Sequence, residues 1–452
     1  MKKTVNIIVT VIIIIVVLSA LWYFFIRQTA RPSITAAPNQ IQNGFVPFNR
    51  ALPANNSGQN ENGGQNNGTT TTTSNAGVPL PVIRQLSATP VGGYAASTTA
   101  STTVVRWIDR GRGNIYEARG DSLDITTISN TLLPRVYQSW WNKDDTTFVG
   151  QYLGDNSDQV TTVIANVLKR ALPKPTVNLP TAASANASST ASSSMALNST
   201  AQLPDITETP YELKGKIVSG DILAVAASPK RDKILVVTDE NDSAVGYISN
   251  FDGSKQTQLF SLPFTQLTVE WPEANTIAVT TKASAYYSGY LYFVNVKTGV
   301  VKQIMGDIKG LATRVSKDAT KVLYSSYDGN NKITTAVYDI KSGKSAPTIF
   351  RTLADKCVWS AVFKEQVYCG VSSQIPAGTY PDSWYLGQNS FIDSIWLLDA
   401  DTGQVRQVAD LLNQGNAIID AFNLQLDEND QYLFFMNKND LSLWSLDLVS
   451  SN

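Results

Sequence analysis

The side chains able to carry out chemistry in this 452-residue chain are restricted, because it contains no histidine. This absence excludes Ser-His-Asp and Cys-His catalysis and every zinc site that uses imidazole. The two cysteines are too few for a Cys₄ zinc site. Carboxylate, tyrosine, lysine or Ser-Lys chemistry and oxygen-ligand sites for hard cations therefore remain.

Three short polar stretches are candidates for ion binding. They are Asp239, Asn241 and Asp242; Asp427, Glu428 and Asp430; and the GlyArgGly sequence within residues 108–118. Neither acidic run has the D-x-D-x-D-G spacing of a calcium loop, so solvated turns explain both better. A hairpin turn explains the GlyArgGly sequence better than an anion site does. We predict no metal, no cofactor and no catalytic residue from these patterns.

Aromatic residues gather in one segment, residues 372–391. They are Tyr380, Trp384, Tyr385 and Phe391, and prolines lie among them. This composition suits a contact surface for a protein or a carbohydrate. The alternative is an ordered loop that folds its aromatic rings back over the rest of the domain.

A pattern that repeats at a fixed interval predicts the elements that position these residues. An apolar run, a polar turn and a second apolar run recur around Trp271, Val315 and Trp359, in steps of 44 residues. This is the period of a four-stranded β-propeller blade. Extending the interval in both directions gives seven copies, whose first runs end at Ser97, Trp141, Ala227, Trp271, Val315, Trp359 and Leu426.

The last copy stops after its third strand, at Leu448. Residues 82–87, VIRQLS, resemble the fourth strand of another copy, VRQVAD at 405–410. We therefore predict an all-β, seven-bladed propeller of four-stranded antiparallel blades, in which residues 82–87 complete the last blade. Such closure removes the open sheet edges that invite aggregation. Trp140, Trp141, Trp271 and Trp359 recur at the ends of first strands, which indicates core packing.

The turns also carry a family resemblance. SKDATKVLYSSYDG, LDENDQYLFFMNKNDLSLWSLDL and the Trp-Ser of VWSAVF are similar to the TolB-type, WD40-like propeller repeat, whose turn reads roughly W-S-P-D-G-K. The resemblance covers most of residues 82–448, with the Pro-Asp-Gly core degenerate in every copy. It implies the propeller fold and no particular activity, because propellers of this type include scaffolds, receptors and enzyme appendages.

The chain outside the repeats predicts a membrane tether. We expect a cytoplasmic tip and transmembrane helix at 1–27, a disordered Asn/Gly/Thr-rich linker at 28–80, and a propeller at 81–449 interrupted by a disordered insertion at 171–209. The apolar stretch at 4–26 is long enough to span a bilayer, whereas a cleaved signal peptide usually has a shorter apolar core. The slight excess of positive charge before this stretch favours a cytoplasmic N-terminus.

Propeller topology assigns the loops to faces. Loops from the fourth strand of one blade to the first of the next, and from second to third strands, share one face. The opposite face receives both ends of the propeller and the insertion at 171–209. The aromatic segment 372–391 joins a second to a third strand, so we expect it on the face away from the tether.

The two cysteines lie in the first two strands of the sixth copy. If Trp359 pairs with Val367 across the turn, Cys357 lies opposite Cys369. An extracytoplasmic compartment favours a disulfide between them. A slip of one residue in register would forbid it.

These features predict a membrane-tethered extracytoplasmic propeller that acts as a non-catalytic binding or scaffolding module of the cell envelope. Its partner would be another envelope protein or a glycan; nucleic acid is not expected, because 36 Lys and Arg balance 37 Asp and Glu. One alternative is a carboxylate-dependent, glycosidase-like hydrolase with two carboxyl groups ~5 to 9.5 Å apart in the central channel. A ligand sensor is the other, although no signalling domain accompanies the propeller.

Overall fold

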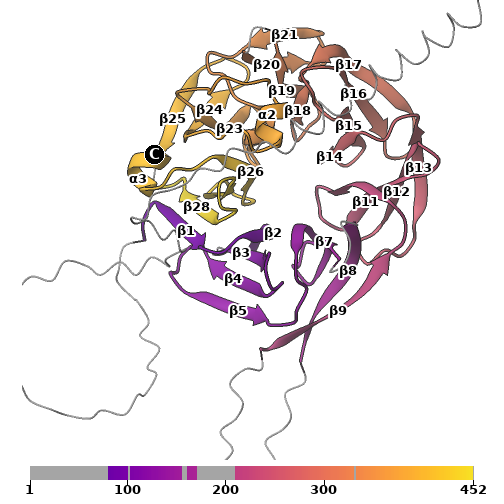
Figure 1. Ribbon diagram of the computed structural model, residues 1–452, viewed down its shortest axis with the longest axis vertical. Helices are drawn as coiled ribbons and strands as arrows, with labels where there is room; N and C mark the ends of the chain where they lie inside the picture. The colour runs from indigo at the N-terminus through magenta and orange to yellow at the C-terminus, as the bar shows by residue number, and fades with distance from the viewer. Residues whose placement is uncertain (1–79, 100–101, 155–159, 171–208, 330–331, 451–452) are drawn as a thin grey trace, which may run out of the picture. The chain divides into compact units, whose positions relative to one another are not determined.

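The computed structural model describes residues 80–99, 102–154, 160–170, 209–329 and 332–450. Within these residues, seven four-stranded antiparallel sheets surround a common axis as the blades of a propeller (Figure 1). The predicted fold class is thus confirmed. The predicted membrane helix and nearly all of both the linker at 28–80 and the insertion at 171–209 lie outside the described residues. Among the helices that are described, none has the length and apolar character needed to cross a membrane.

Each of the first six blades uses four consecutive strands, innermost first. The first three blades are β2 (Val91–Thr99), β3 (Thr102–Asp109), β4 (Ile115–Arg119) and β5 (Ile125–Ser129); β6 (Val136–Trp141), β7 (Thr147–Leu153), β8 (Val160–Lys169) and β9 (Tyr211–Val218); and β10 (Ile222–Ala227), β11 (Lys233–Asp239), β12 (Ala244–Asn250) and β13 (Thr257–Leu262). The next three are β14 (Leu267–Glu273), β15 (Thr276–Thr281), β16 (Ser288–Asn295) and β17 (Val301–Lys309); β18 (Ala312–Val315), β19 (Lys321–Tyr327), β20 (Ile333–Asp339) and β21 (Lys344–Pro347); and β22 (Cys357–Trp359), β23 (Gln366–Ser372), β24 (Asp393–Asp399) and β25 (Val405–Asp410).

The seventh blade joins the two ends of the propeller. It contains β26 (Ala421–Leu426), β27 (Tyr432–Asn437), β28 (Leu443–Asp447) and, outermost, β1 (Ile83–Ser87). In the β1–β28 pair, Ile83 lies opposite Leu446. The amide of Asp447 also donates to the carbonyl of Val82 at 2.8 Å. The first strand therefore closes the ring as predicted.

The turns between first and second strands keep one geometry although their sequences differ. A side chain at the first turn position accepts hydrogen bonds from amides four or five residues later in four blades: Asn142, Ser228, Ser316 and Asp427. Three residues after each of these, the backbone has a positive φ, at Asp145, Arg231, Ala319 and Asp430. Glycine occupies this position in the W-S-P-D-G-K repeat. The hydrogen bonds accepted by the first side chain are therefore compatible with a residue other than glycine at the positive-φ position of the turn.

The core lies between neighbouring blades. Trp141, Trp271 and Trp359 are buried, in agreement with the predicted packing role. The indole of Trp359 donates to the carbonyl of Arg314 in the preceding blade at 2.9 Å. Trp140 is only half-buried and borders the central cavity described below.

The sixth blade contains the predicted cysteine pair. Cys357 lies opposite Cys369, and Trp359 lies opposite Val367. The two Cα atoms are 4.1 Å apart and the sulfur atoms are bonded to each other. This bond joins the first two strands of the blade at their buried ends.

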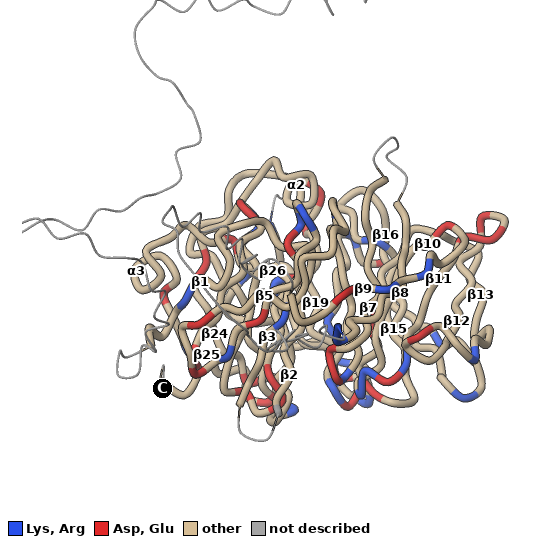
Figure 2. Tube along the Cα trace, turned by 90° about the horizontal axis from the view of Figure 1, so that it is seen from below, with Lys and Arg blue, Asp and Glu red and all other residues tan. Residues whose placement is uncertain are grey.

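Three short helical segments interrupt the strands: η1 (Ala354–Lys356), α2 (Asp382–Tyr385) and α3 (Leu411–Gly415). The helix α2 belongs to the aromatic segment and lies at one face of the ring (Figure 2). The same side view shows Lys, Arg, Asp and Glu interspersed over the molecule, with no broad region of one sign. The β1 strand begins and β28 ends at the opposite face, since both lie on the side of the third-to-fourth-strand turns.

Candidate functional site: the central cavity and the α2 face

Three of the four predicted contact aromatics are buried. Tyr380, Trp384 and Phe391 are 1%, 4% and 3% exposed, and they pack against Ile333 and other apolar side chains. Tyr385 is 38% exposed, and its hydroxyl is bonded to a carboxylate described below. The segment therefore folds back over the propeller, and the first three rings do not form an exposed contact surface.

The α2 segment is also fixed to a distant loop on the same face. Asp382 accepts hydrogen bonds from the Ser284 hydroxyl at 2.9 Å and the Ala285 amide at 2.8 Å, both in the loop between β15 and β16. Next to this junction, Tyr286 and Tyr287 are 66% and 77% exposed. The junction thus presents two exposed aromatic rings on the face that carries α2.

A buried group of charged side chains lies against the aromatic segment that contains α2. Lys356 is paired with Asp393 at 2.7 Å and with Asp420, and all three side chains are almost completely buried. Asp420 also accepts from the indole of Trp384 at 2.9 Å and from the amide of Phe391 at 3.0 Å. These bonds explain why both rings stay folded against the propeller.

One carboxylate of this group, Asp393, is easier to protonate than an exposed aspartate because it is buried. Burial raises the pKa of Asp393 from 3.8 to about 6, with Lys356 opposing the change and Asp420 adding to it. The Oδ2 atom accepts from the amide of Ala421, whereas Oδ1 has no hydrogen-bond partner among the described residues.

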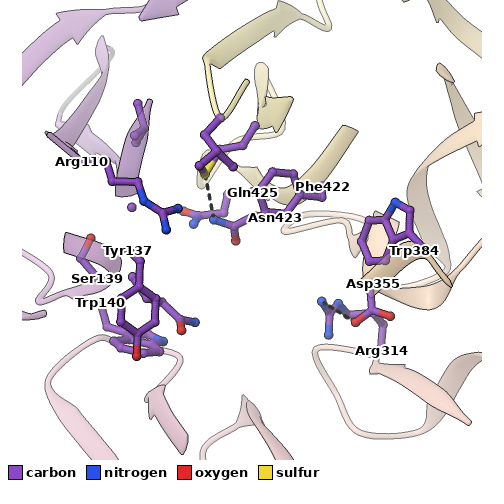
Figure 3. A pocket seen from close by; sticks show the side chains of 15 residues that line it. Arg110, Tyr137, Ser139, Trp140, Arg314, Asp355, Trp384, Phe422, Asn423 and Gln425 are labelled. Atoms are coloured by element: carbon purple, nitrogen blue, oxygen red, sulfur yellow. Dashed lines mark hydrogen bonds and ion pairs between the residues drawn. The ribbon is translucent and has the colours of Figure 1, made fainter. Parts of the chain in front are cut away.

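A cavity of about 410 Å³ lies at the centre of the ring, between inner strands of several blades (Figure 3). One side of the cavity is lined by Arg110, Tyr137, Gln138, Ser139 and Trp140 from the first two blades. The opposite side is lined by Arg314, Asp355 and Trp384. Between the two sides lie Phe422, Asn423 and Gln425 of the last blade. The volume is within the ~300–1,000 Å³ typical of small-molecule sites.

Irregularities in the inner strands shape this cavity. The β26 strand shifts register between Phe422 and Gln425, and Asn423 has a positive φ of 49°. The β2 strand shifts near Gly93, whose φ is 141° and where a Cβ atom would lie 2.3 Å from the Ser139 hydroxyl oxygen. Glycine is therefore required for β2 to approach β6 this closely. Bulges of this kind turn side chains out of the regular sheet.

The two arginines of the cavity differ in their partners. Arg314 is 2.6 Å from Glu270 and 4.0 Å from Asp355. Burial alone would lower the pKa of Arg314, but the negative charges of Glu270 and Asp355 outweigh it and raise the pKa. Tyr385 donates to Asp355 at 2.9 Å. The charge of Arg314 is therefore compensated inside the fold.

The guanidinium of Arg110, in contrast, has no hydrogen-bond or ion-pair partner among the described residues. Figure 3 shows it directed into the cavity, towards Asn423 and Gln425. Burial raises the pKa of the neighbouring Tyr137 hydroxyl, and the positive charge of Arg110 opposes this rise. Arg110 is thus a cation at the cavity surface that the fold leaves uncompensated.

Asp355 is the single carboxylate among the residues that line the cavity, and it is already engaged by Arg314 and Tyr385. Two carboxyl groups facing a substrate would be needed for glycoside hydrolysis. Within the described chain, no three acidic or cysteine side chains are arranged to hold a metal ion.

The prediction of a solvated turn is wrong for Asp427, which is buried because it accepts from the amides of Gln431 and Tyr432 within its turn. In the other acidic run, Asp239 accepts from the amide of Asp242 at 3.0 Å. The GlyArgGly sequence lies in the predicted hairpin turn, between β3 and β4. Sequence reasoning did not identify Arg110, although its position in a second-to-third-strand turn places it on the face of α2.

Comparison with known proteins gives similarity in fold alone. No protein-family model and no curated protein matches the chain. Similar solved structures include TolB from Acinetobacter baumannii (11% identity, TM-score 0.37), with 66% of this chain and 59% of that chain covered. An oligogalacturonate lyase in complex with manganese (9% identity, TM-score 0.46) is covered over 85% of its length by 76% of this chain. Hydrazine synthase from Kuenenia stuttgartiensis (12% identity, TM-score 0.43) is covered over 77% by 70% of this chain. The chain itself is a seven-bladed β-propeller.

Proposed function

We propose that this chain is a membrane-tethered, extracytoplasmic and non-catalytic binding module of the cell envelope. The observation that carries the proposal is the central cavity of the closed propeller. Its lining combines the uncompensated Arg110 with aromatic side chains and side-chain amides. The Cys357–Cys369 disulfide supports an oxidising compartment. The apolar stretch at 4–26 supports the tether.

The topology supports binding on the α2 face. The propeller begins at β1 on the opposite face, where the linker expected at 28–80 would enter. A flexible chain of that length spans on the order of 40 Å. The α2 face, with Tyr286 and Tyr287, would therefore be accessible to a partner in the envelope.

Two experiments test this proposal. Protease added to cells with permeabilised outer envelope layers and an intact cytoplasmic membrane should degrade the propeller, because it lies outside that membrane; full protection would refute the extracytoplasmic location. Crosslinking in the native membrane should then compare Tyr286→Ser/Tyr287→Ser with Val362→Ser/Phe363→Ser. The second pair is similarly exposed but lies in a first-to-second-strand turn, on the opposite face.

The first pair should reduce crosslinking to the partner, and neither pair should change the melting temperature, since all four side chains are largely in solvent. Equal effects of the two pairs on crosslinking would contradict binding through the α2 face.

A further inference from the structure

We propose that the central cavity binds a saccharide that carries a carboxylate group, and that Arg110 holds this carboxylate. The inference rests on the proposed binding function and names the ligand class of the same site. It follows from the distribution of charge in the cavity, from the unused polar groups and from the aromatic surface between them.

The distribution of charge in the cavity favours a ligand with one negative group. Arg314 is compensated by Glu270 and Asp355, so it does not require a ligand charge. Arg110 remains as one uncompensated guanidinium. A guanidinium binds a planar carboxylate through two parallel hydrogen bonds, and the two charges cancel. A phosphate monoester carries up to about two negative charges, so a single arginine would leave part of its charge uncompensated.

The remaining polar groups suit hydroxyls. Gln138 makes no side-chain hydrogen bond within the described part of the chain. The Asn423 amide has only a weak contact to the sulfur of Met436 at 3.6 Å. Side-chain amides both donate and accept, which matches hydroxyl groups that do the same. The bulge in β26 holds Asn423 with a positive φ beside this site, so its placement differs from that in a regular strand.

The apolar part of the lining suits a sugar ring. Trp140 and Tyr137 lie together on one side of the cavity, and Phe422 lies between that side and the opposite one (Figure 3). A pyranose ring presents C–H groups on its faces and hydroxyls at its rim, so aromatic rings can pack against a face while amides bind the rim. Arg110 lines the same side of the cavity and would bind a carboxylate at the rim of that sugar ring.

The test uses the full chain in a detergent without a sugar head group. Titration calorimetry and saturation-transfer NMR would measure binding of a disaccharide of glucuronic acid and N-acetylglucosamine. The comparison compound is the same disaccharide with its carboxylate reduced to a primary alcohol. Because a hydrogen bond to a charged group contributes ~1.5–3 kcal/mol, the acid should bind at least about tenfold more tightly.

Two variants test whether Arg110 is the residue that recognises the carboxylate. Arg110→Gln should weaken binding of the acid by about ten- to a hundredfold and leave binding of the alcohol unchanged. Arg112→Gln is the matched control, because Arg112 lies in the same turn, is exposed and does not line the cavity. It should bind both compounds as the unaltered protein does.

Three results with the two disaccharides would overturn the inference. They are no detectable binding of the acid, equal binding of the acid and the alcohol, and an equal loss in the Arg110 and Arg112 variants. Binding of a tripeptide through its terminal carboxylate, as tight as that of the acid disaccharide, would refute the saccharide class. None of these results would alter the crosslinking comparison on the α2 face, so the proposed function fails or stands separately.

Discussion

Replacing Lys356 by methionine would show how the buried charges stabilise the sixth and seventh blades. Methionine has a similar length and no charge, so the change leaves Asp393 and Asp420 buried without their shared cation. Removing one partner of a buried ion pair typically costs about 3–5 kcal/mol, because the remaining charge is neither hydrated nor paired. We expect a loss of this size in the free energy of unfolding at pH 7.

The loss should be smaller at pH 5. The pKa of Asp393 is raised from 3.8 to about 6 by burial, so the folded protein holds this proton more tightly than the unfolded chain. The stabilisation linked to this proton is fully present below pH 3.8 and disappears as the pH rises through about 6. The difference corresponds to about 3 kcal/mol. At pH 5 Asp393 is largely neutral, and Asp420 keeps its bonds from Trp384 and Phe391.

Urea denaturation followed by tryptophan fluorescence at the two pH values would measure both effects. Lys438→Met is the matched control, because Lys438 also lies over the Trp384 ring, at 5.1 Å, but forms no ion pair within the described residues. It should cost less than about 1 kcal/mol. Asp393→Asn should reduce the dependence of stability on pH between 5 and 7. An equal loss for Lys356→Met at both pH values, or a loss no larger than that of the control, would refute this account of the charges.

The other two predictions concern the aromatic segment and the disulfide. Trp384→Ala should lower the free energy of unfolding by about 3–5 kcal/mol, since a buried indole and its hydrogen bond to Asp420 are lost. Leu386→Ala should change the free energy of unfolding by less than about 0.5 kcal/mol, because Leu386 is exposed. Similar denaturation midpoints for the two variants would contradict the folded-back segment. Cys357→Ala/Cys369→Ala should cost about 3 kcal/mol, as expected for a bond that closes a loop of 12 residues, and thiol labelling of the unaltered protein under non-reducing denaturation should detect no free cysteine.

The architecture could be predicted because the repeat is encoded locally. A blade requires an apolar run, a turn and a second apolar run at a nearly constant interval, and copies around Trp271 and Val315 satisfy this without gaps. The cysteine register followed from one assumed pair, Trp359 with Val367, because strand pairing fixes all neighbouring pairs. The same logic identified residues 82–87 as a fourth strand.

The aromatic segment shows where composition is insufficient. Its sequence is equally compatible with a contact surface and with a packed loop, because both require large apolar rings. What decides between them is the buried Lys356, which Asp393 and Asp420 hold beneath the rings. These three charges come from separate elements, and no local pattern in the sequence joins them.

The central cavity could not be predicted from the repeat for a related reason. A repeat describes what the blades share, whereas the cavity depends on what distinguishes them: the bulge at Asn423, the close approach at Gly93 and the placement of Arg110 after β3. Arg110 lies in the hairpin turn that the sequence predicted, so a turn assignment and the proposed carboxylate-binding role of this side chain are compatible. In a closed ring, the residues of one face converge on the axis from all seven blades. A binding residue is therefore best sought among charged residues of that face that have no ion-pair partner anywhere in the described part of the fold. Arg110 meets that condition, whereas Arg314 is paired with Glu270 of the preceding blade and does not.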